Sequence, residues 1–165
     1  MGHAIDLFIA PKPIKETKVL DLGFALIHEE GYVLIPLHEL NVDSFEIENN
    51  IEDDDYGENI ALDTKVMQEL ARVLGAKSYV IASLDTPDFI GSTYVGAQKI
   101  KHEVPINQAL HALGVPAKNG SEFDYLNLGA YRQTELYYLE AYVNHKDRSN
   151  IQRGHIRSID YGKGI

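Results

Sequence analysis

The chain has 165 residues, of which 44% are hydrophobic and none is cysteine, and its formal net charge is −10. This length favours a single domain with a sizeable core, and the lack of cysteine excludes disulfides, thiolate metal sites and a cysteine nucleophile. The negative charge argues against a nucleic-acid ligand, because binding nucleic acid depends on clustered Lys and Arg.

The chain opens with a predicted strand and a predicted helix. Residues 4–10 are short and apolar apart from Asp6, and two prolines follow them. Residues 16–30 form a predicted helix that Gly31 would cap at its C-terminus. The apolar residues near helical spacing in this segment are Val19, Leu22 and Leu26.

A second strand and the most regular helix come next. Residues 32–37, YVLIPL, are a near-continuous apolar run that favours a buried strand, in which Pro36 would need an edge or bulge position. Residues 60–74 predict a helix that ends at Gly75. Its apolar stripe consists of Leu62, Val66, Met67, Leu70, Val73 and Leu74.

The next segments predict further strands and a short helix. Residues 78–84, SYVIASL, favour a core strand, and residues 89–101 favour one or two more. Residues 105–113 form a predicted helix with Pro105 at its first position and Gly114 at its C-cap.

The last part predicts one more helix, over residues 131–143, and a polar, basic tail at about 148–165 with a short strand around Ile156. The alternation of strands and helices predicts a single α/β (α+β) domain over residues 1–165. We expect a sandwich in which helices pack on a mixed β-sheet.

Acidic residues are concentrated in one segment. Residues 46–59, EIENNIEDDDYGEN, hold seven acids in fourteen positions and no Lys or Arg, and we expect an acidic loop at about 43–59. From Lys146 to the end, five bases and two acids give +3. Such asymmetry favours electrostatic attraction of a basic partner. A solvated acidic linker is an equally open interpretation.

Catalytic and metal-binding motifs are missing. The seven histidines include no pair four residues apart with the zinc-protease pattern, and no nucleophile elbow or glycine-rich phosphate loop occurs. An alignment of the acidic segment with a calcium loop is poor. We therefore predict no metal and no cofactor. No run of about 18 apolar residues and no secretory signal is found, so we expect no membrane contact and a cytoplasmic location.

Tyrosine is the prominent aromatic residue, with ten Tyr and no Trp. Four tyrosines fall within twelve residues: Tyr131, Tyr137, Tyr138 and Tyr142. Tyr is frequent at protein interfaces, but it also borders cores with its hydroxyl in water, and both interpretations stay open.

Three segments resemble the strands of immunity proteins from bacterial contact-dependent growth inhibition systems: AIDLF at 4–8, GYVLIPLHE at 31–39 and SYVIASLD at 78–85. The resemblance covers about the first 85 residues and transfers no contact residue by position. It implies a small cytosolic binding protein, not an enzyme, that neutralises the toxic C-terminal domain of a partner, which in many such systems is a basic nuclease.

The leading hypothesis is therefore an immunity protein that occludes the active site of a cognate toxin by stoichiometric binding. The predicted partner-binding residues are Glu46, Glu48, Glu52, Asp53, Asp54, Asp55, Tyr56, Glu58, Tyr137 and Tyr138. Two alternatives remain: a small enzyme with a site around His102, Glu103 and Asp85, and a dimeric structural or regulatory subunit. The oligomeric state is not predicted.

Overall fold

The computed structural model describes residues 6–37, 39–51, 64–84, 89–117, 125, 126, 128, 151 and 152. Within them the sheet has the strand order β6-β5-β4-β1-β3-β2-β7. The strands are β1 (Asp6–Pro11), β2 (Leu26–Glu29), β3 (Tyr32–Pro36), β4 (Ser78–Ser83), β5 (Ile90–Val95), β6 (Gln98–Pro105) and β7 (Ile151–Gln152). The helices are α1 (Glu16–Asp21), α2 (Glu39–Glu48), α3 (Thr64–Leu74) and α4 (Ile106–Leu113).

The fold is α+β, as predicted, but the sheet is antiparallel between every described pair of strands and is not mixed. Helical connections do join parallel strands, β1 to β2 and β3 to β4, as the alternating sequence suggested. Each connection skips one position in the sheet, however, and an antiparallel strand fills it: β3 lies between β1 and β2, and β1 lies between β3 and β4. Neighbouring strands therefore run in opposite directions.

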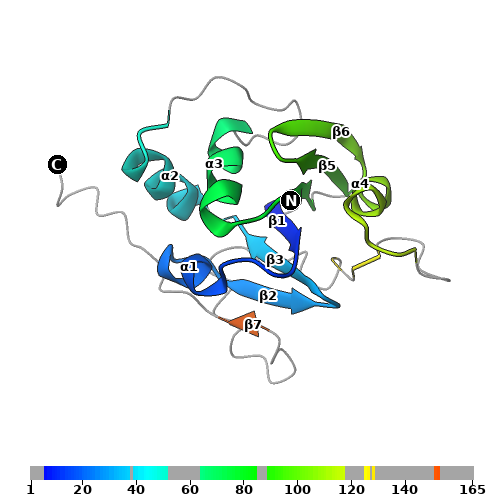
Figure 1. Ribbon diagram of the computed structural model, residues 1–165, viewed down its shortest axis with the longest axis horizontal. Coiled ribbons are helices and arrows are strands. Elements are labelled where there is room, and N and C mark those ends of the chain that lie inside the picture. The colour runs from blue at the N-terminus through cyan, green and yellow to red at the C-terminus, as the bar shows by residue number, and fades with distance from the viewer. Residues whose placement is uncertain are drawn as a thin grey trace, which may run out of the picture.

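The sheet is covered on both faces. Alternate residues of a strand point to opposite faces, so Phe8 packs in the cluster with α1, α2 and α3, while Leu7 and Ile9 pack in the cluster with α4. Figure 1 shows α1, α2 and α3 grouped together and α4 apart from them across the sheet. Because β1, β3 and β4 are buried on both faces, their sequences read as continuous apolar runs.

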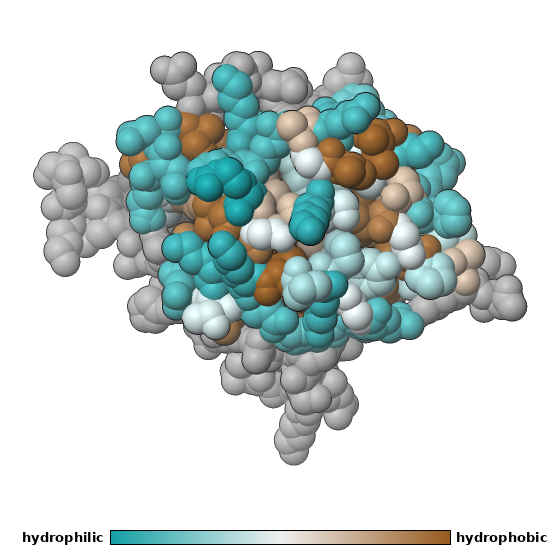
Figure 2. Space-filling view, viewed as in Figure 1, coloured by the Kyte–Doolittle hydropathy of each residue, from teal (hydrophilic) through white to brown (hydrophobic). Residues whose placement is uncertain are grey.

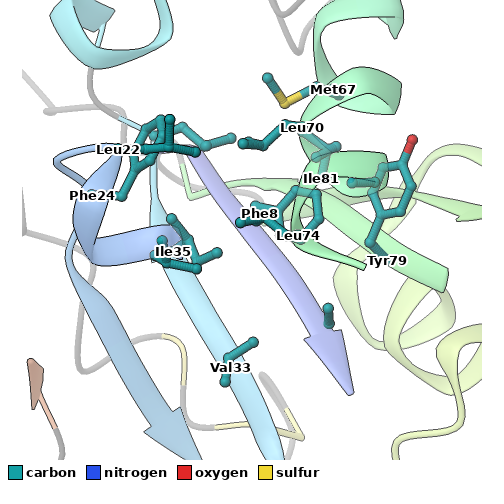
Figure 3. Close-up of a cluster of buried hydrophobic side chains, with 14 of the residues drawn as sticks. Phe8, Leu22, Phe24, Val33, Ile35, Met67, Leu70, Leu74, Tyr79 and Ile81 are labelled. Atoms are coloured by element: carbon teal, nitrogen blue, oxygen red, sulfur yellow. The ribbon is translucent and has the colours of Figure 1, made fainter. Parts of the chain in front are cut away.

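The predicted stripe of α3 is confirmed where the structure describes it. Val66, Met67, Leu70 and Leu74 are each at most 1% exposed. Val73 is half-buried and packs against the same cluster. Figure 3 shows Met67, Leu70 and Leu74 of α3 in the buried cluster that also contains Phe8 and Ile81 of the sheet. Leu62 lies outside the described residues.

Helices α3 and α4 end as predicted, at glycines with left-handed backbone: Gly75 has φ +75° and Gly114 has φ +109°. In both, the two residues after the helix donate back to its last turn, with Ala76 N–H to the Ala71 carbonyl and Val115 N–H to the Leu110 carbonyl. This is the Schellman pattern, which satisfies otherwise unpaired carbonyls. Pro105 is the N-cap of α4 and not its first helical residue.

The predicted helix over 16–30 is wrong in its second half. Helix α1 ends at Asp21, and Gly23, with φ +93°, terminates it in the same Schellman pattern, since Phe24 N–H donates to the Val19 carbonyl. Strand β2 follows. Gly31 is not a helix cap but the second residue of the β2–β3 turn, where Glu30 (φ +50°) and Gly31 (φ +86°) have the positive φ values of a two-residue hairpin.

Pro36 occupies neither an edge strand nor a bulge. It ends β3, opposite Leu7 of β1, past the last residue of β3 that pairs with β2. Strand β4 and the β5–β6 pair agree with the predicted strands. The predicted helix over 131–143 and the strand around Ile156 lie outside the described residues, and β7 falls within the predicted tail.

Candidate partner-binding surface

Helix α2 carries the described part of the acidic segment. Its sequence, ELNVDSFEIE, contains four acids and no Lys or Arg. Because α2 extends to Glu48, residues 43–48 are helical. The acidic loop expected at about 43–59 therefore does not begin at residue 43. Among the described side chains of this segment, Phe45 is buried in the core cluster, and Val42 and Ile51 pack against it.

The C-terminal end of α2 is fixed by backbone hydrogen bonds. Asn50 has φ +53°, its N–H donates to the Ile47 carbonyl, and Ile51 N–H donates to the Glu46 carbonyl. This is again a Schellman end, with Asn in the position that glycine takes elsewhere in the chain. The Asn49 side-chain amide adds a bond to the Phe45 carbonyl at 2.8 Å. The last turn of α2 thus has a defined geometry.

Ile47 is exposed on this last turn. It is 71% exposed, whereas Phe45 is 2% exposed. With 3.6 residues per turn, two positions along a helix correspond to a rotation of about 200°, so Ile47 lies on the opposite side of α2 from Phe45. Glu46 is half-buried and Glu48 is exposed. An apolar side chain therefore stands between two carboxylates on the solvent side.

The structure places two of the ten predicted binding residues, Glu46 and Glu48, and brings them together on α2. The others lie outside the described residues: Glu52, Asp53, Asp54, Asp55, Tyr56, Glu58, Tyr137 and Tyr138. The exposed Ile47 was not among the residues that the sequence predicted as contacts. The signal that could have found it is its position two residues after Phe45, off the apolar stripe and between two acids.

The residues proposed for an enzyme site lie on the edge strand β6. Its register with β5 shifts twice, because Tyr94 pairs with Lys99, Thr93 with Lys101, and Gly91 with Val104. The first bulge brings Lys99 and His102 together, with 3.4 Å between Lys99 Nζ and His102 Nδ1. His102 is exposed. Asp85 lies outside the described residues.

The second bulge of β6 is held by a serine. Glu103 has φ +46°, and its N–H donates to Ser92 Oγ at 2.9 Å.

The lysine of the first bulge also contacts an aromatic ring. Lys99 Nζ lies over the Tyr94 ring, 5.6 Å from its centroid. Lysines and bulges are the features by which exposed sheet edges avoid pairing with other strands. These contacts give His102 and Glu103 a structural explanation, as residues of a bulged edge strand.

Figure 2 shows hydrophilic side chains over most of the viewed face, with apolar side chains reaching the surface in separate patches. Among the described residues, three large hydrophobic side chains are exposed: Ile47, Val95 and Ile100. No group of three His, Asp or Glu in the described ranges could hold a metal ion. None of the described helices is long and apolar enough to cross a membrane.

Comparison of the chain with protein-family models, with curated proteins and with solved structures found no match.

Proposed function

We propose that this chain is an immunity protein that binds a cognate bacterial toxin, of the basic nuclease kind, and neutralises it by covering its active site. The observation that carries the proposal is helix α2, which packs on the core through Phe45 and presents acids with no Lys or Arg on the same helix. The acidic sequence resumes four residues after the end of α2, from Glu52 to Asp55.

The charge of this surface suits a nuclease as partner. A nuclease cleft carries cationic side chains for the phosphates of its substrate, and carboxylates fixed on a helix can take the same places. A strongly acidic chain also accelerates encounter with a basic partner, and the acceleration decreases with salt. The mechanism is stoichiometric occlusion in the cytoplasm, without turnover or cofactor.

The test is growth rescue. The proposal predicts that a large toxin is encoded next to this gene. The C-terminal region of that protein is expressed alone, with this chain, and with the double variant Glu46→Lys, Glu48→Lys. The matched control is Glu29→Lys with Glu30→Lys, which makes the same change of net charge at the β2–β3 turn. We expect rescue by the natural chain and by the control, and loss of rescue in the α2 variant.

Each other result has a defined meaning. Rescue that survives in both double variants would keep the toxin-neutralising function and reject α2 as the interface. Toxicity that the natural chain does not relieve would reject the proposed function for this toxin. Loss of rescue in both variants alike would show dependence on net charge and not on the α2 surface.

A further inference from the structure

We infer that Ile47 is the apolar anchor of the α2 interface, and that the partner receives it in an apolar pocket rimmed by Lys or Arg. This inference rests on the proposed function and adds the chemistry of the contact. Ile47 has the highest exposure, 71%, of the large hydrophobic residues that the structure describes. Interfaces depend on a few central side chains that become fully buried, surrounded by polar contacts that exclude water.

Isolated exposed hydrophobic residues are common on protein surfaces, so the setting of Ile47 matters. Its backbone is held by the Schellman bonds of Asn50 and Ile51 and by the Asn49 side chain. A β-branched side chain on a helix has one strongly preferred χ1 rotamer. Ile47 is therefore ordered before a partner arrives, and its burial would lose little conformational entropy.

The other two exposed hydrophobic residues have a different setting. Ile100 is the extra residue of the first bulge in β6, and Val95 ends β5 beside it. The sequence neighbours of Ile100 are the cationic residues Lys99 and Lys101. Ile47, in contrast, has Glu46 and Glu48 as sequence neighbours and Asp43 one turn before it on the same side of α2.

These acids define the kind of partner. A pocket that receives Ile47 lies next to the exposed Glu48, with the half-buried Glu46 and Asp43 close by. A cationic rim is therefore complementary to this surface, and an acidic rim would be repelled. A second copy of this chain that used its own α2 would bring like charges together. The occupant that fits is a basic protein with a small apolar depression in its cationic cleft, as expected of the proposed toxin.

The experiment measures binding of the purified toxin domain to the whole chain by calorimetry. The variants are Ile47→Ala and its matched control Ile100→Ala, which truncates the same residue type at a site that is 41% exposed. We expect Ile47→Ala to raise Kd about tenfold or more and Ile100→Ala to change it less than about twofold. Because both side chains are exposed, unfolding curves of the two variants should match that of the natural chain.

The outcomes separate the two proposals. If the natural chain binds the toxin and Ile47→Ala binds it as tightly, the anchor is wrong and the proposed function stands. If both truncations weaken binding equally, the inference that Ile47 anchors the interface is also wrong, because Ile47 would contribute no more than Ile100. If the natural chain does not bind the toxin domain, the proposed function is rejected, and the inference about Ile47 is rejected with it.

Discussion

Tyr79 and Tyr94 stack across β4 and β5, with ring centroids 4.8 Å apart and ring planes 8° from parallel. Phe8 of β1 stacks on Tyr79 in turn, at 4.9 Å. The three rings form a ladder beneath α3, and Figure 3 shows the Tyr79 hydroxyl pointing away from Phe8. Tyr79 is fully buried, and its hydroxyl has no hydrogen-bond partner among the described residues.

Removing that hydroxyl should not harm the protein. A buried polar group without a partner lowers stability by about 1–3 kcal/mol. We therefore expect Tyr79→Phe to keep the stacked ring and to raise the free energy of unfolding by about 1 kcal/mol, measured by urea denaturation. Tyr94→Phe is the control and should give no such gain. A loss of stability in Tyr79→Phe would show that the hydroxyl has a partner outside the described residues.

The buried phenol of Tyr79 should also make the protein less stable at alkaline pH. Burial, and secondly the charge of the neighbouring Tyr94, raise the pKa of Tyr79 well above its ordinary value. In the unfolded chain the phenol releases its proton at about pH 10, while in the folded chain it stays protonated. Stability is thus fully present below about pH 10 and decreases as the pH rises above it.

This loss should be smaller in Tyr79→Phe. Urea denaturation at pH 8 and pH 11 gives the loss of stability for the natural chain and for the variant. Equal losses in the two proteins would contradict the raised pKa, because the two proteins differ only at residue 79.

Gly91 should not tolerate a side chain. A Cβ placed on it would lie 3.0 Å from side-chain atoms of Ala109, Ile106 and Val80, where α4 approaches β5 closely. Overpacking of this kind costs about 1–3 kcal/mol, so we expect Gly91→Ala to lower the urea midpoint. Gly96→Asn is the control, since that position has open space and a φ of +60° that Asn accepts. Equal stability of Gly91→Ala and the natural chain would show that α4 moves aside.

Asn50 should be replaceable by glycine and not by valine. Its φ of +53° is left-handed, a conformation that glycine adopts freely and a β-branched residue does not. We expect Asn50→Gly to change the free energy of unfolding by less than about 1 kcal/mol and Asn50→Val to lower it by about 1–2 kcal/mol. If Asn50→Val unfolds at the same urea concentration as the natural chain, the Schellman end of α2 is not rigid.

The lysines of β6 should prevent association of sheet edges. We expect Lys99→Val with Lys101→Val to cause concentration-dependent light scattering, because the edge then presents apolar side chains to other copies. Lys12→Val with Lys77→Val removes the same charge from two exposed positions outside β6 and should leave the chain dispersed. Scattering by both double variants would attribute the effect to lost charge, and scattering by neither would show that the bulges alone protect the edge.

The local patterns of the sequence determined much of the fold. Regular apolar spacing in residues 60–74 predicts the helix that contains α3, and glycines 75 and 114 mark helix ends, since glycine adopts a left-handed backbone without strain. Continuous apolar runs identify β3 and β4, because strands buried on both faces need apolar residues at every position. Glu46 and Glu48 could be chosen as candidate binding residues from charge density alone.

Tertiary structure decided what local patterns leave open. Leu26 fits the helical spacing of Val19 and Leu22, yet it lies in β2, because Gly23 ends α1 and pairing with β3 buries Leu26. The antiparallel order depends on which strand fills each gap in the sheet, and that choice involves residues far apart in the chain. Ile47 became a candidate contact only when the packing of Phe45 fixed the side of α2 that faces the core. The side of a short helix that meets solvent depends on the surface on which it packs, which its own sequence does not contain.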